Sequence, residues 1–394
     1  MKRQQKNSDP SVLVSESGKR VKPSGIREFF DIVYNMKDCI SLGVGEPDFD
    51  TPWRISDTGI NSIREGYTHY TPNRGVSELL RLISEYLLEK YKTSYSPEKE
   101  ILVTMGVSQA LDLTLRSIID PGDEVIVIEP CYVSYAANIE MLNGVAVVIP
   151  TLFSEGFRVD PERLKKAITA RTKAILLNYP SNPTGLSYPE NLLRGIADIA
   201  QKNNLLVISD EIYSAISYGT PHFSIASIPG MKERTVVLNG FSKSHAMTGW
   251  RLGFAAAPEY ILDIMLKIHQ YTGLCAPSIS QYAAIEALEN GDSDVERMVA
   301  EYTRRRNYIA KSFNDIGLPC LYPEGAFYAF PDISPTGLTS REFALRLLET
   351  QKVAVVPGTA FGDSGKNHIR CSFATSMGNI KTALERIDVF VKSL

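Results

Sequence analysis

Short apolar runs rich in β-branched residues alternate with amphipathic stretches through the middle of the chain. Hydrophobic periodicity of this kind predicts strands that alternate with helices, and hence an α/β fold with a largely parallel sheet. The apolar runs are nearly continuous, so we expect both faces of the sheet to be covered. The predicted strands are 101–105, 124–129, 145–149, 174–178, 205–209, 236–239 and 253–257, and helices such as 108–119 and 190–202 lie between them.

The pattern changes after about residue 258, where long helical stretches predominate. We expect helices at 259–269, 279–289 and 293–316, short strands at 326–330, 353–356 and 369–373, and a final helix from about Met377. This predicts a smaller α+β domain behind the large one. The first 50 residues have too few apolar positions to fold alone, so we expect an arm that lies across the small domain or a neighbouring subunit. The expected units are 1–50, 51–290 and 291–394.

The composition of the chain argues against several classes of protein. The chain has 394 residues, of which 44% are hydrophobic and 22% charged, with a net charge of −3, so it creates no field that favours nucleic acid or an anionic membrane. Its 5 cysteines form no CxxC pair, its 5 histidines have no metal-ligand spacing, and residues 1–25 lack the apolar core of a signal peptide. We therefore expect a cytoplasmic globular protein without a metal site or membrane span.

A lysine stands in a polar, glycine-punctuated segment between two apolar strands, Asn239-Gly-Phe-Ser-Lys243-Ser-His. Ligands of open α/β sheets gather at the carboxyl ends of strands, which is where Lys243 is predicted to lie. A lone lysine in a loop is ordinarily a solvated surface charge. The functional interpretation of Lys243 therefore depends on the other polar residues at neighbouring strand ends.

Asp210 directly follows the apolar run 205–209. A buried carboxylate there needs a cationic partner, and the protonated ring nitrogen of a pyridine cofactor is one such partner. The alternative is that Asp210 caps a helix. Tyr213 lies three residues further on and could donate its hydroxyl to a phenolate oxygen of the same cofactor.

Two more turns follow predicted strands. Asn182 lies in Asn178-Tyr-Pro-Ser-Asn-Pro-Thr-Gly185, a rigid turn that could present the Asn182 amide to a bound oxygen or could be only a turn. The Met105–Ser108 segment joins a strand to a helix start, where free N–H groups and the helix dipole favour phosphate. Ser108 as a plain helix cap is compatible with that interpretation. Neither a P-loop nor a complete GxGxxG motif is present, which disfavours nucleotide binding.

Three further side chains have two interpretations each. Tyr132 could stack on a planar ring or pack in the core. Arg370, inside an apolar run, suits a substrate α-carboxylate, and Arg251 suits a phosphate, whereas a structural salt bridge is the alternative for both. Residues 304–306, three arginines in a charge-rich helical stretch, are expected to be solvated.

Taken together and in this order, these segments resemble the class I and II pyridoxal-phosphate-dependent aminotransferases of fold type I over nearly the whole chain. The resemblance implies that Gly43–Asp50 forms a substrate loop, with Gly45 near the substrate carboxylate. It also implies that Tyr70, in His69-Tyr-Thr-Pro, reaches the cofactor phosphate of a neighbouring subunit. A homodimer with shared sites is therefore expected.

The same resemblance implies a role for each remaining residue. Lys243 would hold pyridoxal phosphate as an aldimine (Schiff base) and later transfer the proton. Asp210 would pair with the ring nitrogen, Asn182 and Tyr213 would contact the 3′ oxygen, and Tyr132 would stack on the ring. Phosphate would be bound by Val107, Ser108 and Arg251, with Ser242 as a further ligand, although this chain departs from relatives in having Gly240 where they have a phosphate-binding serine. Arg370, with Gly45 and Asn182, would bind the substrate.

The implied reaction is a ping-pong transamination from an L-amino acid to a 2-oxo acid such as 2-oxoglutarate. Three segments look closest to the bacterial aromatic or N-acetyl-diaminopimelate aminotransferases: Ser24-Gly-Ile-Arg-Glu-Phe29, Ser242-Lys-Ser-His245 and Ile268-His-Gln-Tyr271. A C–S β-lyase on the same cofactor is the alternative enzyme. A non-catalytic sensor that binds pyridoxal phosphate is the alternative from another class.

Overall fold

The computed structural model describes residues 13–21, 23, 25 and 38–394. Its strands are β1 Ile40–Ser41, β2 Ile101–Thr104, β3 Glu124–Glu129, β4 Val145–Pro150, β5 Thr172–Asn178, β6 Leu206–Asp210, β7 Thr235–Gly240, β8 Gly253–Ala256, β9 Tyr328–Ala329, β10 Val353–Ala354, β11 Val356–Pro357 and β12 Ile369–Ser372. Its helices are α1 Glu16–Arg20, α3 Trp53–Arg64, α4 Ser77–Tyr91, α5 Gly106–Ile118, α6 Ser134–Met141, α7 Pro161–Ala167, α8 Glu190–Lys202, α9 Glu259–Thr272, α10 Ser278–Asn290, α11 Asp292–Ile316, α12 Ser340–Gln351 and α13 Met377–Lys392. The resemblance seen in Ser24–Phe29 falls largely outside the described residues.

The large sheet has seven strands in the order β2-β8-β7-β6-β5-β3-β4. All neighbouring pairs are parallel except those of β8, which runs antiparallel to both β2 and β7. Alternate residues of β3 enter different cores, Val125 and Val127 on one face, Ile126 and Ile128 on the other. Because side chains alternate across a strand, the continuous apolar runs follow from two covered faces. The predicted α/β fold with a mostly parallel sheet is confirmed.

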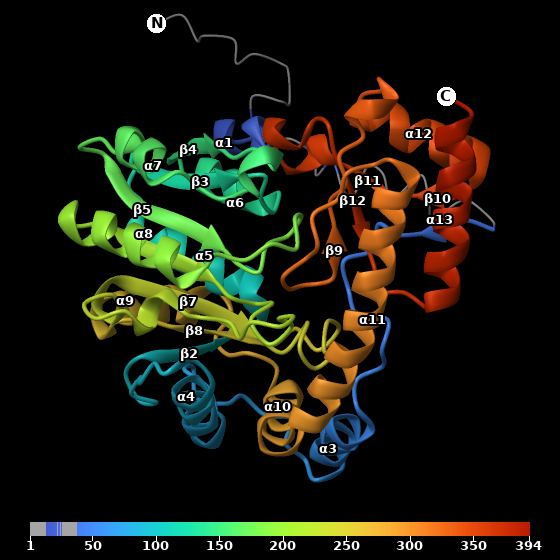
Figure 1. Cartoon of the computed structure of the whole chain (residues 1–394). Helices are drawn as coiled ribbons and strands as arrows, with labels where there is room; N and C mark the ends of the chain where they lie inside the picture. Colours follow the sequence, from blue (N-terminus) through green and yellow to red (C-terminus); the bar gives the residue numbers. More distant parts are fainter. Residues whose placement is uncertain (1–12, 22, 24, 26–37) are drawn as a thin grey trace, which may run out of the picture.

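Helices cover both faces of this sheet (Figure 1). The core of one face combines α5, α6 and α9 with the strands, and that of the other combines α7 and α8 at one end with α4 and α10 at the other. In Figure 1 these layers fill the left of the view, while α11, α12 and α13 stand on the right beside the short strands β9 to β12. Among the described residues, no helix is both long and apolar enough to cross a bilayer.

The C-terminal part is the expected smaller α+β unit. Its antiparallel sheet has the order β11-β12-β9, and α11, α12 and α13 share one buried core with it. Strand β1 pairs in parallel with β10, and Leu42 lies in this core. Helix α1 lies against α6 instead, where Arg20 Nη2 donates to Asn143 Oδ1 at 2.6 Å. The boundaries at residues 50 and 290 stay predictions.

One expectation about α11 is wrong. Arg305 is not solvated: it is 5% exposed and its guanidinium bonds to Asp48 and Glu301. Arg304 is exposed as expected, whereas Arg306 is half-buried and stacks over Tyr218 and Tyr322. The charge-rich sequence did not indicate that Arg305 faces inward, because its counter-charge Asp48 lies in a distant segment of the chain.

Candidate active site

A cavity of about 700 Å³ opens at the carboxyl ends of β5, β6 and β7. Parallel strands end at the same sheet edge, so the polar residues that follow them converge there. The cavity also receives the start of α5, the loop after β1, and β12. Of the residues singled out from the sequence it brings together Gly45, Val107, Ser108, Tyr132, Asn182, Asp210, Tyr213, Ser242, Lys243, Arg251 and Arg370. Tyr70 is the exception: it is 83% exposed and lines no part of this cavity.

Lys243 lies three residues beyond β7, and its Nζ donates to the Gly45 carbonyl at 2.7 Å. Burial lowers the pKa of the Lys243 amine to about 8, with repulsion from Arg370 and Arg251 adding to the effect and attraction to Glu46 opposing it. Desolvation disfavours the charged form of a lysine. A substantial neutral fraction is therefore present near neutral pH, and a neutral amine is both a nucleophile and a base.

Asp210 is the last residue of β6 and is buried. Its Oδ2 accepts from the Tyr135 hydroxyl at 2.8 Å, and its Oδ1 accepts from the Ile212 N–H at 3.2 Å. Burial raises the pKa of this carboxyl to about 6 even though both donors lower it. No described helix starts at Asp210, so the helix-cap alternative is wrong. A cation placed in the cavity beside this carboxylate would restore its charged form.

The start of α5 forms a second polar wall. The helix begins at Gly106, and its N-cap residue Met105 makes no side-chain cap bond, so Ser108 lies inside the first turn rather than capping the helix. Gly106 has φ +73°, and a Cβ on it would lie 2.9 Å from Nη2 of Arg251. The missing side chain lets the guanidinium approach the helix start. N–H groups of a first turn beside an arginine form a suitable site for a phosphate dianion.

Arg370 lies opposite in β12 and is 2% exposed. Its Nη1 donates to Asn182 Oδ1 at 2.9 Å and its Nη2 to the Gly43 carbonyl at 2.6 Å, while its buried Nε has no partner among the described residues. The guanidinium lies between the rings of Tyr328 and Phe361, 4.6 and 4.9 Å from their centroids. Neither Arg370 nor Arg251 forms an ion pair with a described carboxylate, which argues against the salt-bridge alternative. A bound anion would balance the buried charge of Arg370.

Tyr132 lines the cavity and also packs against the core of the α5 face. Its ring meets Tyr135 edge-on, with centroids 5.7 Å apart. The stacking and packing interpretations are thus compatible.

The sequence interpretation missed two tyrosines of the site. Tyr135 supports Asp210, and the Tyr328 hydroxyl lies 2.7 Å from that of Tyr213. Tyr328 stood inside a predicted apolar strand, where an aromatic ring is expected for packing alone. Tyr135 could have been predicted from the sequence more readily than Tyr328. It follows Tyr132 by three residues, and that spacing is typical of neighbours on one helical turn.

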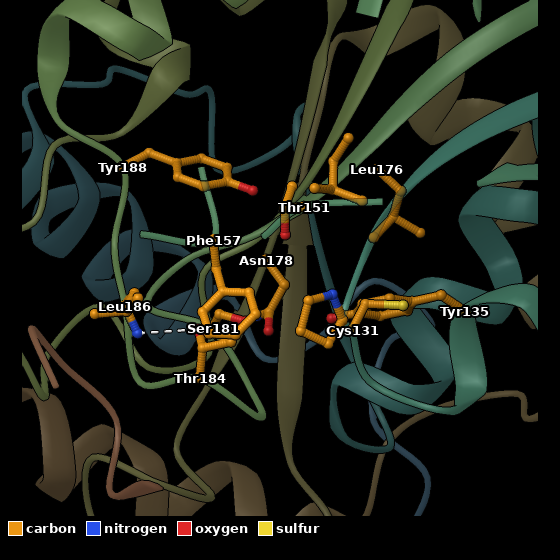
Figure 2. A pocket seen from close by; sticks show the side chains of 12 residues that line it. Cys131, Tyr135, Thr151, Phe157, Leu176, Asn178, Ser181, Thr184, Leu186 and Tyr188 are labelled. Carbon is orange, nitrogen blue, oxygen red and sulfur yellow. Dashed lines mark hydrogen bonds between the residues drawn. The ribbon is translucent and has the colours of Figure 1, made fainter. Parts of the chain in front are cut away.

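Figure 2 shows a second, smaller cavity, which shares two lining residues with the main one. Its volume of about 20 Å³ suits one water molecule rather than a substrate. Tyr135 and Asn178 line both cavities and so form the wall between them. Asn178 is held there by its own bonds, since its Nδ2 donates to the Asp210 carbonyl and its Oδ1 accepts from the Asn182 N–H.

Comparison with known proteins shows the family of the chain. The family model "Aminotransferase class I and II" matches residues 37–387. The "Putative aminotransferase YugH" of Bacillus subtilis is 51% identical over 96% of this chain and 98% of its own length. An aspartate aminotransferase of Pyrococcus abyssi is 46% identical, with 93% and 95% covered.

The solved structure of an aromatic aminotransferase from Pyrococcus horikoshii superposes with a TM-score of 0.89 at 42% identity, covering 93% of this chain and 99% of that one. The same fold therefore extends over almost the whole length of both molecules. The family model, the relatives and the fold agree: the chain belongs to the class I and II aminotransferases, which use pyridoxal phosphate.

Proposed function

We propose that the amino donor is an L-amino acid with a large uncharged side chain, such as an aromatic one, and that the acceptor is a 2-oxo acid. The observation that carries this is the lining of the cavity. Its described residues include three basic side chains, Lys243, Arg251 and Arg370, and each has a proposed role that leaves no further cation for an acidic donor side chain. Apolar groups such as Val44, Val133 and Ile212 line the cavity as well.

The residues present fit pyridoxal phosphate. The uncapped start of α5 with Arg251 matches its phosphate, and the buried carboxylate of Asp210 matches its ring nitrogen. Val107, Ser108 and Ser242 would complete the phosphate site, and Tyr132 would lie against the ring. Asn182 and Tyr213 would contact its 3′ oxygen. When bound, the cofactor supplies an electron-withdrawing ring that stabilises negative charge on the substrate's Cα.

The chain's own side chains would then do the following. Arg370 binds the α-carboxylate where its guanidinium lines the cavity, with Asn182 and the Gly43 carbonyl holding that guanidinium in place. Gly45 borders the same region of the cavity. Lys243 accepts the proton from Cα as a neutral amine, which its lowered pKa of about 8 makes available.

We also propose that two copies of the chain assemble with shared sites. Tyr70 supports this because it is exposed and does not line the cavity of its own chain, and Trp53 and Tyr271 are also exposed aromatic residues. Exposed large apolar groups are typical of an interface.

The described cysteines are all free, which is in keeping with a reducing compartment such as the cytoplasm.

A spectroscopic donor screen tests the proposed substrate. Each candidate amino acid is added to the holoenzyme, and conversion of the cofactor to its amino form is followed by absorbance. Phenylalanine and tyrosine are expected to convert the cofactor faster than aspartate, and Lys243→Ala is expected to abolish turnover. Faster conversion by aspartate would overturn the donor proposal. Release of pyruvate and ammonia from a cysteine conjugate, with no 2-oxo acid present, would support the lyase instead.

A further inference from the structure

Arg305 is an unusual arginine because its charged group is enclosed on all sides. It lies on α11 and is 5% exposed, with Phe49 and Tyr302 packed 5.2 and 5.7 Å from its guanidinium carbon. Its Nε donates to Glu301 Oε1 at 3.0 Å, one turn back on the same helix. A buried guanidinium needs partners for its remaining donors. Those partners come from two segments outside the helix.

The first segment is the loop after β1, where Asp48 Oδ1 accepts from Arg305 Nη1 at 2.7 Å. The second is the chain just beyond β12, where the Phe373 carbonyl accepts from the same nitrogen at 3.5 Å. One guanidinium therefore contacts both the loop that carries Gly43 and Gly45 and the strand that carries Arg370.

These two segments meet directly at the proposed carboxylate site. The Ser372 N–H donates to the Leu42 carbonyl at 2.6 Å, and Arg370 Nη2 donates to the Gly43 carbonyl at 2.6 Å. Two residues further along the loop, the Gly45 carbonyl accepts from Lys243. The position of this loop against β12 thus sets which groups Arg370 contacts.

We infer that Arg305 is a positioning residue for substrate binding, which holds the Gly43–Asp50 loop and the end of β12 at the spacing that Arg370 needs to bind an α-carboxylate. The inference rests on the proposed role of Arg370. Amino donor and 2-oxo acceptor both carry this carboxylate, so losing Arg305 must weaken the binding of both by a similar factor. The cofactor contacts of α5, Asp210 and Arg251 do not involve Arg305 and are unaffected.

The test uses Arg305→Met, because methionine keeps an apolar stem between Phe49 and Tyr302 and removes only the charged fork. In the holoenzyme, KM for the donor and for the acceptor should each rise on the order of tenfold, about 1.4 kcal/mol of binding, while kcat changes much less. The dissociation constant of 3-phenylpropanoate, an unreactive monocarboxylate, should rise by the same factor in an absorbance titration. Asp48→Ala should reproduce the effect, and combining both substitutions should add little further.

Arg304→Met is the matched control. Arg304 neighbours Arg305 on α11 and pairs with the same Glu301, but its side chain is 73% exposed and makes no described contact with the loop. It should leave both KM values unchanged. Arg305→Lys, which keeps a charge near Asp48, should recover part of the loss. Unfolding midpoints of all variants are measured alongside, and a lowered midpoint with unchanged KM in Arg305→Met would show a purely structural role and overturn the inference.

Arg370→Met separates this inference from the proposed site. If Arg370→Met leaves KM unchanged, the carboxylate assignment itself fails. If Arg370→Met raises KM and Arg305→Met does not, only the role of Arg305 fails. Should Arg305→Met not fold, Asp48→Ala decides the question, since that variant leaves Arg305 paired with Glu301, and a wild-type KM there would also refute the inference.

Discussion

At the scale of single residues, the same side-chain type has opposite roles depending on its surroundings. Lys243 and Lys202 are both lysines near the end of a regular element, yet Lys202 is exposed and pairs with Asp198, whereas Lys243 faces the cavity. Loss of solvent around Lys243 lowers its pKa to about 8. Burial in the cavity, rather than the residue type, makes this amine reactive near neutral pH.

The lowered pKa predicts how cofactor uptake depends on pH. A lysine with a depressed pKa is neutral above that value, so the rate at which the apoprotein takes up pyridoxal phosphate should rise with pH and level off above about 8. N-acetyl-lysine under the same conditions gives the reference for an ordinary amine, whose rate keeps rising toward a pKa of about 10.4. Stopped-flow absorbance from pH 6 to 10 measures both. A protein rate that still climbs at pH 10 would contradict the burial argument.

At the scale of elements, the site is formed by the ends of strands and the start of a helix. Three parallel strands finish at one edge and deliver Asn182, Asp210 and Lys243 within a few residues of their last paired positions. Helix α5 contributes its start rather than its length. The close approach there depends on Gly106, whose left-handed backbone and missing Cβ admit Arg251.

Gly106→Ala should therefore weaken cofactor binding. The added methyl group meets Arg251 Nη2 at 2.9 Å and sits at a backbone φ of +73°, so the dissociation constant for pyridoxal phosphate should rise on the order of tenfold. Gly122→Ala is the control: it has φ +90° and nothing within 4 Å of the new methyl group. It should cost about 1 kcal/mol of stability and leave the cofactor titration unchanged. Equal affinity in the two variants would count against a phosphate site at α5.

At the scale of the whole molecule, the C-terminal unit completes the site of the large sheet. Arg370 arrives from β12, while the loop after β1 crosses between the two units and touches both Arg370 and Lys243. Tyr70 lies outside this arrangement in a single chain. Its proposed role therefore requires a second copy.

Hybrid dimers test the shared site. Lys243→Ala and Tyr70→Ala homodimers should each be nearly inactive, and mixing them under subunit exchange should restore activity. A hybrid holds one site with both native residues, so an equal mixture should reach about a quarter of wild-type activity by statistical assortment of subunits. Activity that does not recover, although native mass spectrometry shows hybrids, would place Tyr70 in a role within its own chain.

The sequence predicted the regular elements well because their periodicity is local. Strand β3 appears at 124–129 as expected. The alternation of its side chains between the two faces of the sheet can be predicted without knowing which distant residues they contact. The ordered motifs likewise indicated Lys243, Asp210, Asn182 and Arg370. The start of α5 was placed two residues late because serine is a favoured cap, and here no side chain caps that helix.

The sequence by itself thus determined the elements, their order and the residues that follow the strands, since each depends on neighbours in the chain. Tertiary structure alone decided that Arg305 is buried, because its counter-charge Asp48 lies 257 positions away. It also decided that Tyr135 supports Asp210 and that Arg370 keeps one nitrogen unpaired. Burial and pairing are properties of the folded contacts, and a local pattern cannot specify which distant group meets a charge.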